Sequence, residues 1–114
     1  MFDEDRGVKI LAIDLLGRYD NPASVTTLAA LINDPVEEYR VRSILAMGNT
    51  GSNDAVELLV SVLNDQSKPV RLATMQALGK LGKKSAAPAI EKRIAVEEDA
   101  EVVEAGKAAL KGLK

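Results

Sequence analysis

The sequence repeats itself with a period of 31 residues. Glycine recurs at Gly17, Gly48 and Gly79, and aspartate recurs at Asp34 and Asp65. A period of this length is typical of a solenoid, in which each unit is too small to bury its apolar face alone and must stack on its neighbours. We therefore expect a stack of equivalent units, and such stacks usually serve as binding surfaces. Apolar positions follow the same step at two further sets of residues, Ile13, Ile44 and Met75, and Leu28, Leu59 and Ile90.

Each unit is predicted to contain two helices. Between Tyr39 and Met47 the apolar residues follow helical spacing, and Gly48 is expected to end this helix as a left-handed residue. The cluster at 52–54 then offers an N-cap for a second helix near 54–64. Because no window shows the period-two alternation of a strand, we expect no sheet.

We predict an all-α solenoid of HEAT-like hairpins, with about seven helices in one domain that spans 1–114. The repeats are expected at about 3–33, 34–64 and 65–97, with a final half-repeat at 98–114, and a longer array is compatible with this pattern. One position in the first helix of each unit stays small, which would let neighbouring helices approach closely. These small residues are Ala12, Ser43, Thr74 and, after a one-residue insertion, Gly106.

The composition argues against an enzyme. The chain has no cysteine, histidine or tryptophan, which removes thiolate and imidazole metal ligands, cysteine nucleophiles and the commonest general base. Because carboxylates, lysines and hydroxyls are a poor inventory for catalysis, we expect a non-catalytic protein without cofactor or metal. Charge or glycine interrupts every apolar run before the roughly 20 residues that a membrane span needs, so the expected location is cytoplasmic.

The best-formed unit begins at Pro69-Val70-Arg71 and continues through Ala77-Leu78-Gly79 to Leu81-Gly82. This pattern resembles the short HEAT-like repeat of bacteria and archaea, and more narrowly the repeats of phycobilisome lyase subunits. Residues 34–51 are a looser copy of it. The resemblance covers essentially the whole chain and implies an α-solenoid, but it says little about activity.

The resemblance also implies roles for particular residues. In this family an aspartate between repeats and an arginine of the first helix typically form a ladder that joins adjacent units, here Asp34 and Asp65 with Arg40 and Arg71. In stacks of this type the second helices usually line the concave face, where a partner would bind. By helical geometry, the residues opposite the buried side of these helices include Thr26, Ala30, Asn33, Glu57, Ser61, Asn64 and Lys92.

The two ends of the predicted stack differ in polarity. Lys107 in the last helix and Arg93 in the helix before it stand where earlier units have apolar residues, as in a polar capping repeat. In the first helix, Leu11 and Leu15 replace charged or small residues of the later units, so this helix is apolar nearly all round. We expect contacts at this end from earlier repeats, from a partner, or from a second copy of the chain.

Charge is distributed unevenly along the chain. Residues 1–67 carry a net charge of −6 and residues 68–114 one of +4, which together give −2. The lysines of the second half could form a basic patch, but a pI near 5.2 and scarce aromatic residues argue against a nucleic-acid partner. An acidic cluster precedes the last helix and is expected to complement its dipole rather than to bind metal: Glu97, Glu98, Asp99 and Glu101.

These observations favour a non-catalytic scaffold for protein–protein interaction. Its partner would be another protein or a peptide, and a homo-oligomer through the N-terminal end is a further option. The alternative is a phycobilin lyase-like subunit or accessory factor, which would bind a bilin or a phycobiliprotein. The sequence does not specify the partner, the pathway or the oligomeric state.

Overall fold

The chain folds into helices joined by short turns. The computed structural model describes residues 4–19 and 21–113, so residues 3 and 114, the outer limits of the predicted repeats, lie outside the described part. Within it, the predicted all-α class with seven α-helices is confirmed, together with one short 3₁₀ helix at Lys84–Ala86. The α-helices are α1 (Glu4–Leu16), α2 (Pro22–Leu31), α3 (Glu37–Asn49), α4 (Asp54–Val60), α5 (Lys68–Leu81), α6 (Ala87–Val96) and α7 (Ala100–Gly112).

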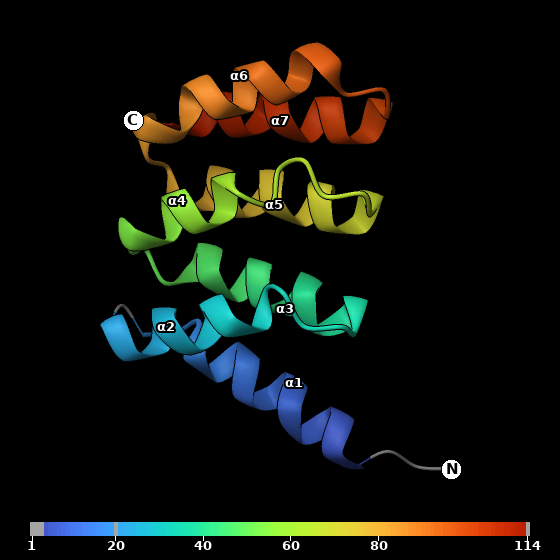
Figure 1. Ribbon diagram of the computed structural model, residues 1–114. Helices are drawn as coiled ribbons and strands as arrows, with labels where there is room; N and C mark the ends of the chain where they lie inside the picture. Colours follow the sequence, from blue (N-terminus) through green and yellow to red (C-terminus); the bar gives the residue numbers. More distant parts are fainter. Residues whose placement is uncertain (1–3, 20, 114) are drawn as a thin grey trace.

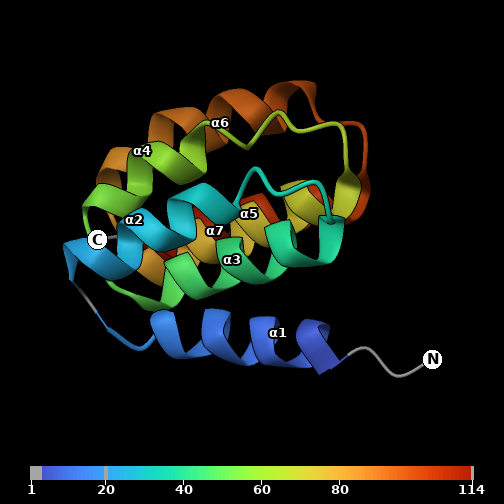
Figure 2. The ribbon, with the colours of Figure 1, turned by 60° about the horizontal axis from the view of Figure 1, so that its bottom comes forward.

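The helices form two layers that rise through the stack, with α1 tilted relative to the first helices that follow it (Figure 1). Helices α1, α3, α5 and α7 make the first-helix layer, and α2, α4 and α6 make the second-helix layer. Each first helix packs against the first helix of the next unit, and α1 forms one end of the stack (Figure 2). The arrangement is therefore the predicted solenoid, in which equivalent segments are related by one repeated step.

The core follows the sequence period through the stack. Ile13, Ile44 and Met75 occupy equivalent positions of successive first helices and are fully buried. Leu28, Leu59 and Ile90 do the same in the second helices. Each such side chain stabilises the fold by roughly 1.5–3 kcal/mol relative to an exposed one, so the periodic apolar positions carry most of the driving force.

Glycine and alanine set the spacing between first helices. Helix α3 runs through Gly48 to Asn49, and the left-handed glycines are Gly51 and Gly82. The expectation that Gly48 ends the helix was therefore wrong. A Cβ on Gly48 would lie 2.7 Å from the Cα of Ala77 in the next unit, so this position leaves no room for a side chain.

The same junction occurs at every step of the stack. A Cβ on Gly17 would lie 2.7 Å from the backbone oxygen of Ala46, and one on Gly79 would lie 3.0 Å from the Cα of Ala109. The second helices have fewer contacts with one another and stand further apart. The concavity predicted for the second-helix layer stays a prediction.

Ion pairs join a first helix to the acidic residue that opens the next unit at Lys9–Asp34 and at Arg71–Glu97, and these partners differ from those expected. Arg71 donates from Nε and Nη2 to the carboxylate of Glu97, at 2.9 and 3.2 Å. Arg93 donates from Nε to the same carboxylate at 3.1 Å. The Glu97 side chain is 1% exposed, so this group is a nearly dry, doubly paired carboxylate. With the one-residue insertion, Glu97 is the equivalent of Asp34 and Asp65 at the start of the final half-repeat.

Asp34 and Asp65 do contact Arg40 and Arg71, but through their backbone oxygens and not through their carboxylates. Arg40 Nη1 donates to the backbone oxygen of Asp34 at 3.0 Å, and Arg71 Nη1 donates to that of Asp65, also at 3.0 Å. The Asp34 carboxylate instead accepts a hydrogen bond from Lys9 of the preceding unit at 3.3 Å. A basic residue of one first helix thus reaches the acidic residue that opens the next unit, as Arg71 reaches Glu97.

Hydrogen bonding keeps the Glu97 carboxyl ionised in the folded state. Burial by itself raises the pKa of Glu97, but hydrogen bonds from Arg71, the Asp99 backbone and Arg93 hold that pKa below its ordinary value of 4.5. Folding therefore favours the charged form of this side chain.

We expect Gly48→Ala to lower the free energy of unfolding by about 1–3 kcal/mol, because the added Cβ overlaps the Ala77 backbone. The melting temperature, followed by circular dichroism, would fall by roughly 4–8 °C for each kcal/mol. The matched control is Gly7→Ala on α1, where a Cβ would meet no atom within 4 Å. Alanine is the better helix former there and should stabilise by about 0.5–1 kcal/mol. Equal stabilisation by both substitutions would contradict the close junction.

We expect Glu97→Gln to cost about 3 kcal/mol near pH 7, because it leaves two arginines facing a neutral side chain. The pKa of Glu97 is lowered on folding, so its stabilisation is fully present above pH 4.5 and is lost as the pH falls through the folded-state value. Urea unfolding at several pH values should show the difference between wild type and variant shrink toward acid pH. The control is Glu98→Gln, an exposed neighbour. A penalty at position 97 that stays constant down to pH 3 would rule out the ionic role.

Candidate protein-binding surfaces

The seven residues predicted to face a partner are all exposed in the second-helix layer. Thr26 and Ala30 lie on α2, and Asn33 follows its end. The others come from α4, the turn after it and α6: Glu57, Ser61, Asn64 and Lys92. Sequence periodicity therefore located the solvent side of these helices correctly, while their role in binding stays a prediction.

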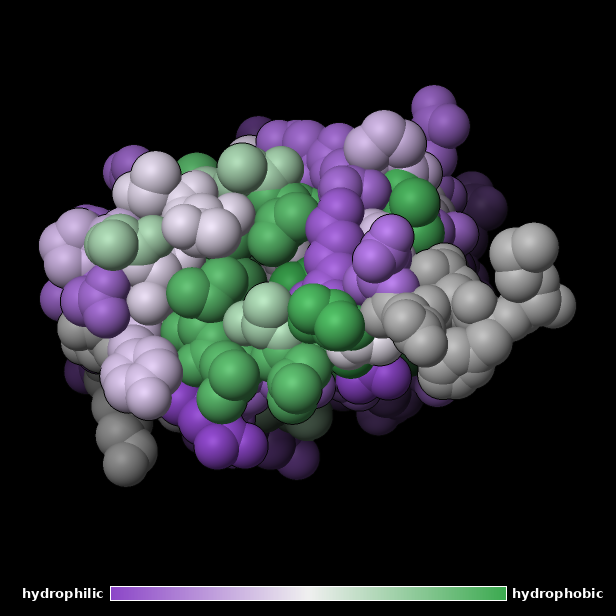
Figure 3. Space-filling view, turned by 90° about the horizontal axis from the view of Figure 1, so that it is seen from below, coloured by the Kyte–Doolittle hydropathy of each residue, from purple (hydrophilic) through white to green (hydrophobic). Residues whose placement is uncertain are grey.

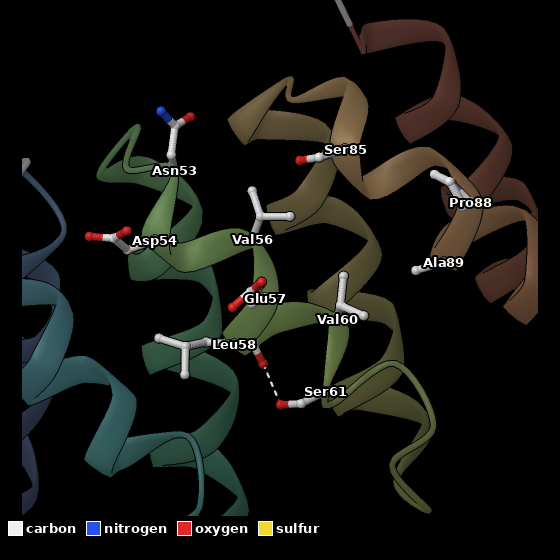
Figure 4. Close-up of a pocket in the computed structure, with 10 residues that line it drawn as sticks. All are labelled: Asn53, Asp54, Val56, Glu57, Leu58, Val60, Ser61, Ser85, Pro88 and Ala89. Atoms are coloured by element: carbon white, nitrogen blue, oxygen red, sulfur yellow. Dashed lines mark hydrogen bonds between the residues drawn. The ribbon is translucent and has the colours of Figure 1, made fainter.

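A groove of about 890 Å³ separates α4 from α6 (Figure 4). It contains two of the predicted residues, Glu57 and Ser61. The Ser61 hydroxyl donates to the backbone oxygen of Leu58. Its acidic groups, Asp54 and Glu57, both come from α4. The remaining lining residues are largely apolar, and Pro88 among them also belongs to the exposed side predicted from helical geometry: Asn53, Val56, Leu58, Val60, Ser85, Pro88 and Ala89.

Helix α4 is shorter than the sequence predicts. The helix was expected to continue to about residue 64, but it ends at Val60 and is followed by turns through residue 64. The segment from 61 to 64 has no Gly or Pro to announce this early end. The sequence repeat does indicate one residue of the opposite wall, because Pro88 on α6 lies one 31-residue period after Glu57.

A second, smaller groove of about 360 Å³ lies beside the C-terminal half of α6. Asn64 and Lys92 both line it, so the structure brings these two predicted residues together. Arg93 Nη1 donates to Asn64 Oδ1 at 2.9 Å and ties the turn after α4 to α6. This groove carries basic side chains, whereas the groove between α4 and α6 is acidic.

Within residues 4–19 and 21–113, no group of three or more carboxylates is placed to hold a metal ion. The sequence supplies no thiol or imidazole, and the groove between α4 and α6 offers carboxylates and hydroxyls beside apolar walls. Among the described helices, none is long and apolar enough to cross a membrane.

The N-terminal face of the stack is apolar and open. We define it as Val8, Leu11, Ala12, Leu15 and Tyr19. Val8 is 67% exposed, Leu11 61%, Leu15 41% and Tyr19 57%, and Ala12 is also exposed. Viewed from this end, apolar side chains gather across the middle of the molecule (Figure 3). The sequence had indicated Leu11 and Leu15 but not Val8 or Tyr19.

In the later units, most residues at the positions equivalent to this face are buried by the preceding first helix. Val70, Ala73 and Ala77 on α5 are at most 3% exposed, because α3 of the preceding unit covers them. Val102 and Ala109 on α7 are buried by α5 in the same way. On α3 the equivalent of Leu15 is the buried Ala46, whereas that of Leu11 is the exposed Arg42. The N-terminal face thus exposes most of the positions that the later units cover.

The C-terminal end of the stack is polar instead. Glu104, Lys107 and Lys111 are exposed on α7 at positions where internal first helices meet the next unit. Lys107 occupies the position of the fully buried Ile13, and Lys111 that of the junction glycines. The predicted difference between the two ends is thus present in the structure.

Comparison with known proteins supports this architecture. Among solved structures, the chain is similar to one in the complex of CpcE and CpcF of phycocyanin lyase from Nostoc sp. PCC7120, with 28% sequence identity and a TM-score of 0.79. The similarity covers 97% of this chain and 49% of the other, so this chain spans about half the length of that protein. No curated protein gives a significant match.

The family assignment rests on a separate comparison. The model for HEAT repeats matches residues 1–65 and 26–111, which together cover nearly the whole chain. The matched segments contain the periodic core and all three glycine–alanine junctions described above. The chain belongs to the HEAT repeat family.

Proposed function

We propose that this chain is a phycobilin lyase-like subunit or accessory factor that acts by binding another protein. The observation that carries the proposal is the similarity to a chain of the phycocyanin lyase CpcE–CpcF complex over 97% of this chain. That chain is found in a complex of two different subunits, which supports a protein partner here as well.

The residues of the chain favour a supporting role in such an assembly. A covalent adduct with a bilin on this chain would need a thiol, and the sequence has no cysteine. It also has no histidine to act as a general base near neutral pH. The chain would therefore hold and orient a partner without catalysing a reaction itself, and the expected cytoplasmic location is kept with this role.

The groove between α4 and α6 is the surface that we assign to the phycobiliprotein. Its apolar walls include Val56, Val60 and Pro88, and its charges are the carboxylates of Asp54 and Glu57. Bilins carry propionate groups, which these carboxylates would repel. A protein segment with apolar and basic side chains fits the groove better, so the chain would recognise the protein component rather than the pigment.

A second candidate is a general scaffold for an unrelated protein or peptide. The same groove supports it, since apolar walls with a charged rim suit many extended or helical segments. The two candidates differ in whether phycocyanin is the ligand.

Titration calorimetry with phycocyanin lacking its pigment, and separately with free bilin, tests the proposal. We expect binding of the protein and none of the free bilin. Glu57→Lys should weaken protein binding by about tenfold, because it reverses a charge inside the groove. Glu98→Lys makes the same change at an exposed site outside the groove and should leave binding unaltered. Absence of phycocyanin binding would remove the lyase-like role and leave the general scaffold.

A further inference from the structure

The N-terminal face cannot accept an ordinary preceding repeat. At the internal junctions the alanine that meets the glycine of the previous unit is Ala46, Ala77 or Ala109. Leu15 holds this position in α1. A Cβ added to the junction glycine would lie only 2.7 to 3.0 Å from atoms of the alanine, so the two backbones have room for the alanine methyl alone. A leucine in place of that alanine would overlap the preceding first helix. A partner on this face must therefore present something other than the glycine-bearing side of a HEAT first helix.

Head-to-tail stacking of two copies fails for the same reason and for a second one. It would place the C-terminal end of one copy, with Lys107 and Lys111, on the N-terminal face of the other. Lys111 holds the glycine position of the junction, so it would meet Leu15 where the internal junctions leave no space. Both lysines would also lose water against the apolar stripe of α1.

The N-terminal face is complementary to itself. Val8, Leu11, Ala12 and Leu15 are spaced i, i+3, i+4 and i+7, which forms one apolar stripe along α1. If two α1 helices lie antiparallel across a two-fold axis between residues 11 and 12, Leu15 of each copy faces Val8 of the other. Leu11 then faces Ala12, so each large side chain meets a smaller one.

Charge fits the same register. The pairing that sets residue 15 against residue 8 also sets the exposed Asp5 of one copy against the exposed Arg18 of the other, at both ends of the helix pair. Antiparallel helices in addition place the positive end of each dipole beside the negative end of its partner. A parallel arrangement would bring Asp5 against Asp5 and would lose both contributions.

We infer that the chain forms a two-fold symmetric dimer in which the α1 helices of two copies pack antiparallel through the N-terminal face. Symmetric dimers of this kind are the commonest protein oligomers, because one self-complementary patch serves both subunits. A single helix per subunit makes a small interface, so we expect dissociation in the micromolar range. The dimer leaves both second-helix grooves open, and it does not depend on the function proposed above.

Sedimentation equilibrium over micromolar to millimolar protein tests the dimer directly. We expect the mass to rise from that of one chain to that of two. Leu15→Glu should raise the dissociation constant by more than about 100-fold, because dimerisation would then bury an unpaired carboxylate. The control is Val96→Glu, which changes another exposed apolar residue far from α1 and should leave the dimer intact. Circular dichroism of each variant separates loss of the dimer from loss of the fold.

Two further measurements test the antiparallel register. Asp5→Arg or Arg18→Asp alone should weaken the dimer by about 2- to 5-fold, and the two together should restore it. Because the chain has no cysteine of its own, Ala12→Cys should give a disulfide-linked dimer on mild oxidation, since residue 12 lies beside the two-fold axis. Ala108→Cys, exposed on α7, should not.

Several results would overturn the inference. A mass of one chain at every concentration, or a dimer that survives Leu15→Glu, would exclude the N-terminal face as the interface. Crosslinking of Ala108→Cys as readily as Ala12→Cys would place the contact elsewhere. A double charge reversal that fails to restore binding would exclude the antiparallel register.

Discussion

The close approach of successive first helices is the contact on which the rest of this structure depends. At each junction a glycine lies against the backbone of an alanine in the next unit, with no room for a Cβ on the glycine. This spacing brings Ile13, Ile44 and Met75 together as one continuous core. A single hairpin could not exclude water from such side chains, so the units are stable only as a stack. The second helices stand further apart, and grooves open between them.

The two ends of the stack follow from the same junction. An internal first helix needs glycine on one side and alanine on the other, and the end helices break this rule in different ways. Helix α7 has Lys111 at the glycine position, which stops the stack with a hydrated charge. Helix α1 has Leu15 at the alanine position, which excludes an ordinary neighbour but keeps the surface apolar. The polar end needs no cover, whereas the apolar end favours a partner of a different shape.

The charged contacts between units show that a recurring pair of residue types located the right region but not the actual partners. The recurrence of Asp34 and Asp65 with Arg40 and Arg71 pointed to the right region of the fold. In the structure the arginines donate to the backbone oxygens of those aspartates, and the carboxylate that pairs with Arg71 is Glu97, one step after Asp65. A one-residue insertion and the change from aspartate to glutamate hid this equivalence. Glu97 had instead been assigned, as part of an acidic cluster, to the dipole of the last helix.

The sequence by itself determined the all-α class, the seven helices, the periodic core and the solvent side of the second helices. These properties depend on residues a few positions apart or on exact recurrence, both of which are visible in one dimension. Only the tertiary structure decided that Gly48 spaces helices rather than ending one, that a groove opens between α4 and α6, and that Val8 and Tyr19 belong to the N-terminal face. Each of these depends on distances between helices that are some 30 residues apart in the chain, and packing sets those distances.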